Sequence, residues 1–200
     1  MNMTGYLDWR FRGTSWLTLL VALICVVVID FLPESCGYKN SPIENIQMVV
    51  VAVGLFFSCT AKDRKTLYTF VSLLLFFVLA REVNYGRTLI IFADPENVNS
   101  YPKWKDMEYG WLAHVFVGIY LLWVAIYFIW RKVWREIGAV LRETRIPVVD
   151  VLLTVAGMLM GVTFESCHLN LPEELAEVVF YVGGVGTLYL YTRNKVSKVE

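Results

Sequence analysis

Three ionisable residues at the ends of apolar segments are the best candidates for chemistry in this sequence. Glu82 closes the apolar run 67–80, His114 lies early in the run that follows Trp111, and Glu174 opens the last apolar run. A charge costs about 2.5–3.5 kcal/mol at the centre of a membrane span and less toward its ends, so such residues usually have a function. We expect Glu82 and His114 to act as acid and base or as metal ligands, and Glu174 to orient a histidine or take a proton.

The residues around Glu82 and Glu174 are suited to binding a substrate. The candidates are polar or charged and are expected near the same membrane face: Arg81, Asn84, Tyr85, Arg87, Glu108 and Glu177. Either arginine would hold an anionic group. Glu174 and Glu177 are three residues apart on one helical face, which favours one of them holding a proton. The alternative is a structural ion pair between an arginine and one of these carboxylates.

A divalent metal is the sharpest cofactor hypothesis. Glu165 and His168 have the Glu-x-x-His spacing of carboxylate-bridged metal sites, and with His114 they would supply three ligands. The sequence has two histidines and one copy of this spacing. A histidine held only by hydrogen bonds is therefore the alternative.

Composition limits the class of protein. The 200 residues are 57% hydrophobic, and the apolar residues fall in separate runs, as in a multi-span membrane protein. The formal net charge of zero argues against nucleic-acid binding. The four cysteines form no C-x-x-C pair, which argues against a thiol redox centre, although Cys36 and Cys167 would face the same compartment and are open to disulfide formation.

The apolar runs predict an all-α integral membrane bundle of six transmembrane helices. The expected spans are 15–32, 46–61, 66–85, 111–130, 148–164 and 174–191. They form a single domain over residues 1–200, with a long extracytoplasmic loop at 86–110 and a cytoplasmic amphipathic segment at 131–146. Gly157 and Gly161 form a G-x-x-x-G pattern typical of close helix packing.

The distribution of lysine and arginine predicts the orientation. Thirteen of the 18 basic residues fall on the side of the two termini and five on the other, so both termini are expected in the cytoplasm. Counting residues from the cytoplasmic ends then places several ionisable groups at one depth near the outer surface: Asp30, Glu82, His114, Glu165, His168, Glu174 and Glu177. We expect them to converge in one polar site.

The segment Glu82-Val83-Asn84-Tyr85-Gly86 resembles a motif of an uncharacterised family of small bacterial multi-pass membrane proteins. Those proteins carry Glu-x-Ser-Trp-Gly-Gln-Arg after a span, then a proline turn, a Glu before a His, and an acid pair opening a later span. The corresponding positions here are Glu82, Tyr85, Gly86, Pro95, Glu108, His114, Glu173, Glu174 and Glu177. Asn84 stands in place of the serine and Arg87 in place of the glutamine. The resemblance implies a membrane location and no established activity.

These features together predict a multi-pass protein of the bacterial inner membrane. The expected function is to act on or bind a lipid or envelope intermediate at a carboxylate and histidine site in the outer leaflet. Two alternatives are a non-catalytic assembly or immunity-type partner of another membrane protein, and a small proton-coupled transporter. The expected partners are membrane lipids and a membrane protein or a second copy of the chain.

Overall fold

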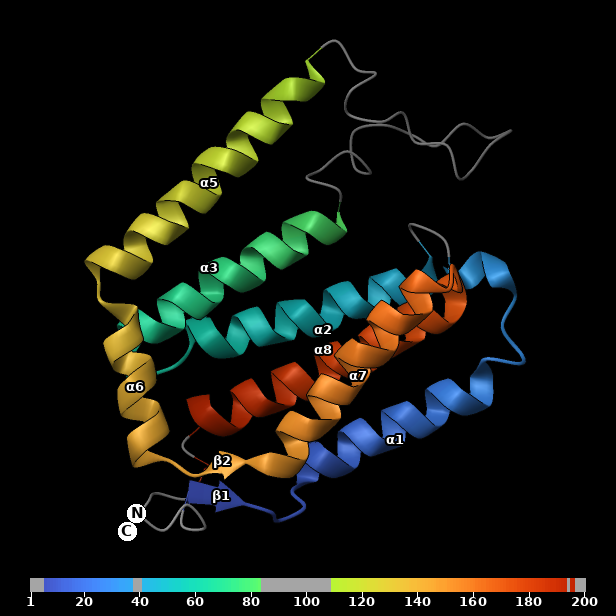
Figure 1. Cartoon of the computed structure of the whole chain (residues 1–200), viewed down its shortest axis with the longest axis horizontal. Coiled ribbons are helices and arrows are strands. Elements are labelled where there is room, and N and C mark those ends of the chain that lie inside the picture. Colours follow the sequence, from blue (N-terminus) through green and yellow to red (C-terminus); the bar gives the residue numbers. More distant parts are fainter. Residues whose placement is uncertain (1–5, 38–40, 84–108, 194, 197–200) are drawn as a thin grey trace.

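The computed structural model describes residues 6–37, 41–83, 109–193 and 195–196. These residues are mainly helical (Figure 1). The helices are α1 (Gly13–Val28), the short 3₁₀ helix η2 (Glu34–Gly37), α2 (Pro42–Cys59), α3 (Lys65–Glu82), α5 (Gly110–Trp130), α6 (Val133–Glu143), α7 (Val148–Ser166) and α8 (Asn170–Thr192).

Each of the six predicted spans corresponds to one long helix. Among the described helices, α2, α5, α7 and α8 are long and apolar enough to cross a membrane. The apolar helix α1 is shorter, at 16 residues. α3 carries Lys65, Arg81 and Glu82 within its 18 residues, so the whole helix is less apolar than the run 67–80 at its centre. The chain is therefore an all-helical protein with several membrane-compatible helices.

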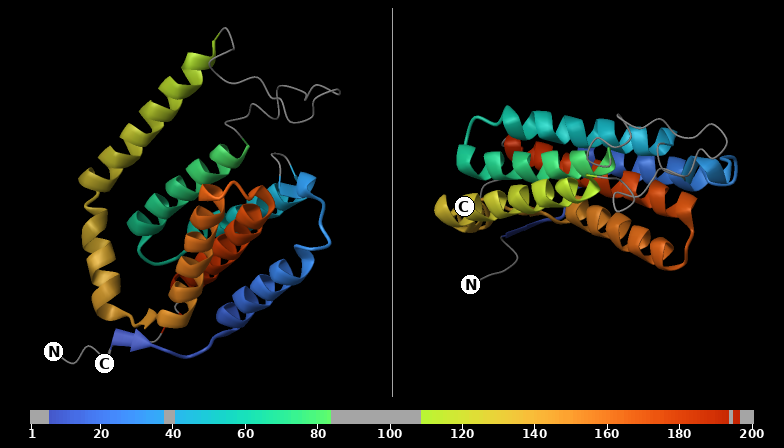
Figure 2. Two further views of the ribbon diagram at one scale, coloured as in Figure 1. Left: turned by 45° about the vertical axis from the view of Figure 1, so that its right-hand side comes forward. Right: turned by 90° about the horizontal axis from the view of Figure 1, so that it is seen from above.

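Helix α8 lies at the centre of the described structure. It packs against α7, α2 and α1, while α3 packs on the other side of α2 and α5 lies at the edge beside α3 (Figure 1). Seen from above, α2 and α7 lie on opposite sides of α8 (Figure 2). Three faces of α8 are therefore in contact with neighbouring helices.

Glycine allows α7 and α8 to approach closely. A Cβ atom added at Gly157 of α7 would lie 2.7 Å from the backbone nitrogen of Phe180, and one added at Gly183 of α8 would lie 2.6 Å from Thr154 Oγ1. No side chain fits at these distances without moving a helix. Of the G-x-x-x-G pattern, Gly157 thus lies at a close contact between α7 and α8, whereas a Cβ atom added at Gly161 would lie an ordinary 3.7 Å from Glu177 Cγ.

Two helices begin about four residues earlier than predicted. α2 begins at Pro42 because the Ser41 side chain accepts a hydrogen bond from the Glu44 amide and Pro42 occupies the first helical position. α8 begins at Asn170 instead of Glu174, with Glu173 in its first turn. The predicted spans left out both first turns because those turns are polar, although they belong to the same helices.

A short parallel strand pair holds the N-terminal arm, which the all-helical prediction did not include. Strand β1 (Leu7–Asp8) pairs with β2 (Ile146–Pro147), directly before α7. The Asp8 side chain is 6% exposed and accepts from Arg12 Nη2 at 2.6 Å and from the Arg10 amide at 3.0 Å. Burial alone would raise the pKa of Asp8, but these hydrogen bonds and the two arginine charges lower it below its ordinary value.

The predicted amphipathic segment 131–146 contains α6. The helix follows Lys132, whose φ of 51° turns the chain sharply after α5. Arg64, at the start of α3, pairs with Glu136 at 3.3 Å and Glu143 at 2.5 Å, both on α6. These exposed ion pairs connect α6 to the end of α3 where Lys65 lies.

Candidate functional site

Glu82 is a buried carboxylate at the end of α3. Its side chain is 7% exposed, and its Oε1 accepts hydrogen bonds from the Tyr181 hydroxyl of α8 and from Arg81 Nη2, each at 2.9 Å. The same Arg81 nitrogen donates to the Tyr181 oxygen at 3.4 Å. The Arg81 side chain remains 55% exposed. The carboxylate is thus fixed inside the bundle while the guanidinium reaches the surface.

A second polar contact joins α2 to the beginning of α8. Gln47 is fully buried, and its Nε2 donates to Glu174 Oε2 at 2.8 Å and to the Glu174 carbonyl at 2.9 Å. Its Oε1 has no hydrogen-bond partner among the described residues. Glu44, one turn earlier on α2, is also buried. The contact fixes the register of α2 against α8 and leaves one buried acceptor for a further donor.

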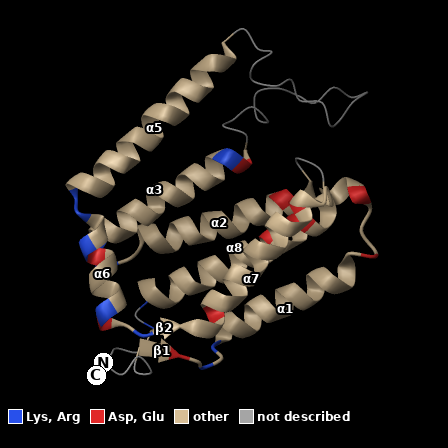
Figure 3. Ribbon diagram, viewed as in Figure 1, with Lys and Arg blue, Asp and Glu red and all other residues tan. Residues whose placement is uncertain are grey.

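Glu177 connects the two contacts electrostatically. It interacts with Glu82 and with Arg81, while Glu174 interacts with both Glu177 and Glu44. We call this group the acidic cluster. Its members come from α2, α3 and α8: Glu44, Gln47, Arg81, Glu82, Glu174, Glu177 and Tyr181. Several acidic positions, red in Figure 3, lie near one another on the ribbon where α2, α7 and α8 meet.

Helical spacing explains why these residues meet. Glu174, Glu177 and Tyr181 follow one another at intervals of three and four, which places them on one face of α8. Glu44 and Gln47 are likewise three apart on α2. Because α8 packs against α2, these faces meet, and the last turn of α3 closes the group.

The acidic cluster contains more carboxylates than cations. Glu82, Glu174 and Glu177 face a single described cation of the group, Arg81. Three carboxylates at the edge of an apolar bundle are not all stable as bare anions, so protons, hydrogen-bond donors or a cationic group must compensate them. The acidic cluster is therefore suited to exchange protons with a bound molecule, or to accept hydrogen bonds from that molecule.

An apolar cavity adjoins the same end of α3. It has a volume of about 480 Å³ and lies between α3 and α5. Phe76, Phe77 and Ala80 line it on α3, and Ala80 directly precedes Arg81. Phe116 and Tyr120 line it on α5. An apolar cavity beside a charged group is the pattern expected for a molecule with a polar head and an apolar tail.

The chain was compared with protein-family models, curated proteins and solved structures. None of them matches it. The resemblance at Glu82-Val83-Asn84-Tyr85-Gly86 therefore stays a prediction, and the function has to be inferred from the geometry of the site.

The structure brings together four of the residues singled out in the sequence. Glu82, Arg81, Glu174 and Glu177 all belong to the acidic cluster. Among the described residues, Arg81 forms its ion pair with its neighbour Glu82, and it interacts with Glu177 of α8 only electrostatically, without an ion-pair contact. The ion pair considered as a structural alternative is thus present, but it forms within one helical turn and accounts for only one of the carboxylates.

The predicted metal ligands do not gather into one site among the described residues, although Glu165 interacts electrostatically with Glu177 of the acidic cluster. His114 is exposed on α5, and Glu165 and His168 are exposed at and beyond the end of α7. Among the described residues, no three His, Cys, Asp or Glu side chains gather closely enough to hold a metal ion. His168 adopts a φ of 58° in the turn between α7 and α8, which breaks the helical geometry that Glu-x-x-His ligation needs.

Four other candidates fall outside the described part of the chain. They are Asn84, Tyr85, Arg87 and Glu108, and the long loop 86–110 lies there almost entirely. The cysteines Cys36 and Cys167, considered as a disulfide, are free thiols in the structure.

Sequence reasoning missed Gln47 and Tyr181, which provide the hydrogen bonds of the site. Both have neutral side chains within apolar runs, so a search for charged residues passes over them. A signal was nevertheless present. Gln47 lies three residues after Glu44, and Tyr181 lies four after Glu177, so each continues a polar helical face.

Asp150 is a further buried carboxylate, in the first turn of α7 and away from the acidic cluster. Asp150 is 1% exposed, and its Oδ1 accepts from the Thr14 hydroxyl of α1 at 2.6 Å. Thr14 lies beside Gly186 of α8, nine residues beyond Glu177, which corresponds to a separation of roughly 13 Å along the helix. Tyr181 is the only residue between Glu177 and Gly186 with a polar side chain. The two buried carboxylate sites are therefore separated by an apolar stretch of α8.

Proposed function

We propose that the chain is a protein of the bacterial inner membrane with six transmembrane helices and both termini in the cytoplasm. Its acidic cluster lies toward the outer leaflet and binds, or acts on, a lipid or another envelope intermediate. The proposal rests on two features at the same end of α3: a hydrogen-bonded group of carboxylates, arginine and tyrosine, and an apolar cavity whose lining on α3 ends at Ala80, the residue before Arg81.

The chemistry of the cluster suggests a role for each residue. Arg81, which is half exposed, contacts a phosphate or another anionic group of the bound molecule. Glu174 and Glu177 take or give a proton, or accept hydrogen bonds from hydroxyl or amino groups. Glu82 and Tyr181 hold Arg81 in place, and the cavity between α3 and α5 receives the apolar portion.

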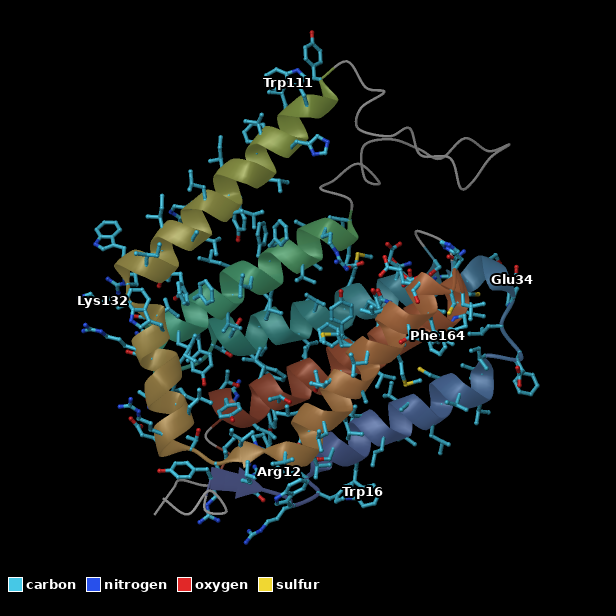
Figure 4. The ribbon with its side chains drawn as sticks, viewed as in Figure 1. Arg12, Trp16, Glu34, Trp111, Lys132 and Phe164 are labelled. Carbon is cyan, nitrogen blue, oxygen red and sulfur yellow. The ribbon has the colours of Figure 1, made fainter. Side chains whose placement is uncertain are left out.

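Mass spectrometry of copurifying lipids tests this proposal. Wild-type protein, Arg81→Gln and Glu174→Gln are purified in a mild detergent, and the retained lipids are identified and quantified. We expect a lipid enriched over the bulk membrane in the wild type and reduced about tenfold or more in both variants. Glu34→Gln is the matched control, because Glu34 is an exposed acid in η2 (Figure 4). Identical lipid profiles in all four proteins would reject the proposal.

A non-catalytic partner of another membrane protein is the second candidate. The observation in its favour is α5, whose largest contacts are with α3 and α6 and which exposes many large apolar side chains, including Trp111, Phe116, Trp123 and Ile129. A stoichiometric protein that copurifies with the wild type, and is lost when Phe116 and Trp123 are changed to alanine, would favour this candidate.

Proton-coupled transport is less well supported. The acidic cluster would serve as one half of a relay and Asp150 as the other. Between Tyr181, which belongs to the acidic cluster, and Gly186, α8 has no polar side chain to carry a proton between the two.

A further inference from the structure

A second elongated cavity lies on the other side of the bundle, between α1 and α2. Both helices pack against α8 but make few contacts with each other. The groove between them has a volume of about 680 Å³. Val182, Val185 and Gly186 of α8 form its floor, with Leu17 of α1 and Val53 of α2 on its two sides. We call it the α1–α2 groove.

The α1–α2 groove is apolar along most of its length. On α2 it extends from Val49 to Phe57, eight residues, or about 12 Å along the helix. Val53 is 41% exposed and Leu17 52% exposed, so the groove opens sideways to the surface of the bundle. In a membrane that opening faces the acyl chains of the lipids. Its shape and lining therefore fit one hydrocarbon chain lying parallel to the helices.

One end of the groove is positively charged. Arg12 and Lys195 line it there, and the guanidinium of Arg193 lies 5.8 Å from the centre of the Phe57 ring (Figure 4 labels Arg12). Arg12 is already occupied, because it pairs with Asp8 and donates to the Lys195 carbonyl. Arg193 donates a long hydrogen bond of 3.4 Å to Thr60 Oγ1 and pairs with no carboxylate of the described residues. Lys195 has no carboxylate partner among the described residues.

We propose that the α1–α2 groove is a binding site for an anionic phospholipid. One acyl chain lies against Val53, Val185 and Gly186, and the phosphate group is held by Lys195 and Arg193. The choice of an anionic lipid follows from charge complementarity: the mouth of the groove has two cations without a carboxylate partner among the described residues, whereas a zwitterionic headgroup brings its own cation.

The site is independent of the acidic cluster. The two lie at opposite ends of the bundle: the acidic cluster is at the beginning of α8, and the basic mouth of the groove is at its end. The basic end is also the one expected to face the cytoplasm, where the leaflet carries anionic lipids. The groove would therefore anchor the protein at one surface while a different molecule binds at the other.

Native mass spectrometry of the full-length protein tests the site. Protein stripped of endogenous lipid is titrated with palmitoyl-oleoyl-phosphatidylglycerol or with the corresponding phosphatidylcholine. We expect the wild type to retain one phosphatidylglycerol in preference to phosphatidylcholine. Arg193→Gln combined with Lys195→Gln should weaken retention of phosphatidylglycerol by roughly fivefold for each charge removed. The matched control, Arg131→Gln combined with Lys132→Gln, removes two exposed charges after α5 and should leave it unchanged.

A variant that fills the groove tests the acyl-chain contact separately. Val53→Trp should reduce retention of phosphatidylglycerol, because the larger side chain occupies the space of the acyl chain. Ile46→Trp places the same side chain at an exposed α2 position outside the groove and should have no effect. Equal retention of both lipids by the wild type would overturn the proposal. So would unchanged phosphatidylglycerol binding in folded Val53→Trp and in the double-charge variant.

Discussion

The Glu82 carboxylate is held by two donors of different kinds. Tyr181 comes from another helix and is 8% exposed, whereas Arg81 is the neighbouring residue and is half exposed. The tyrosine therefore connects α3 to α8, and the arginine is the part of the group that a ligand can reach. A buried hydrogen bond to a carboxylate contributes more to stability than an exposed ion pair does.

Removing the Tyr181 hydroxyl should destabilise the protein measurably. Tyr181→Phe keeps the ring but leaves the buried Glu82 oxygen with one donor fewer, so we expect the free energy of unfolding to fall by about 1–2 kcal/mol. Tyr109→Phe, at an exposed position at the start of α5, should change it by less than about 0.5 kcal/mol. Unfolding of both variants in detergent measures the difference. Equal stabilities would show that the Tyr181 bond does not hold α3 to α8.

The Asp8 carboxylate should make the stability of the protein depend on pH. Because its pKa is lowered in the folded protein, its contribution is complete above the unfolded value of about 3.8 and is lost as the pH falls through the folded value. Asp8→Asn should therefore be less stable than the wild type at pH 6, by about 1 kcal/mol, and equally stable near pH 2. The measurement is the unfolding midpoint of both proteins at each pH.

An exposed acid provides the control for that measurement. Asp30→Asn changes a carboxylate beyond the end of α1 that is exposed to solvent, and it should match the wild type at both pH values. A difference between wild type and Asp8→Asn that persists at pH 2 would mean that the charge of Asp8 is not what holds the N-terminal arm.

At the scale of the helix, the contact between α7 and α8 determines where the acidic cluster lies. α8 carries Glu174, Glu177 and Tyr181, and its position is fixed on one side by Gly157 of α7. The glycine permits backbone contact that any larger residue prevents. A substitution at Gly157, which is not part of the acidic cluster, should therefore displace the cluster by moving α8.

Gly157→Leu should separate the two helices. The new side chain would meet the backbone of Phe180, so we expect a loss of about 1–3 kcal/mol in unfolding free energy, together with weaker lipid retention at the acidic cluster. Gly118→Leu, on α5, is the matched control, because no atom lies within 4 Å of a Cβ added there. If both variants were equally stable, the tight α7–α8 contact would be disproved.

The sequence predicted the helices well and the contacts between them only in part. Hydropathy found all six long helices, since a long run of apolar residues is their shared property, but it placed the starts of α2 and α8 late because a capping serine and acidic first turns are polar. Glu82, Glu174 and Glu177 were found because a charge in an apolar run is conspicuous. Tyr181 and Gln47 were missed because their role depends on which helices face each other.

The metal hypothesis shows the same limit. Glu165 and His168 have ligand spacing in the sequence, but the chain leaves helical geometry at His168, and α5 carries His114 on an exposed face. Spacing alone does not reveal where a helix ends. Whether His114, Glu165 and His168 can bind one metal depends on where α7 ends and which way α5 faces.

For the whole molecule, the proposed topology predicts which residues are accessible from each side. Cys167 follows α7 at the acidic end, and Lys132 lies between α5 and α6 at the other. In a protein whose other cysteines are replaced, a membrane-impermeant maleimide should label Cys167 in intact spheroplasts. It should label Lys132→Cys, in a protein lacking Cys167, only after the membrane is opened. Labelling of both from the outside would contradict the six-span arrangement.

The most direct test of the account is an experimental structure of the protein in a lipid nanodisc, determined by electron cryo-microscopy. We predict that Glu82, Glu174, Glu177 and Tyr181 converge at one membrane depth near the outer leaflet, and that a lipid-like molecule contacts Arg81 and enters the cavity between α3 and α5. Carboxylates at unrelated depths, or a cavity sealed by side chains with Arg81 directed into bulk water, would contradict the proposed site.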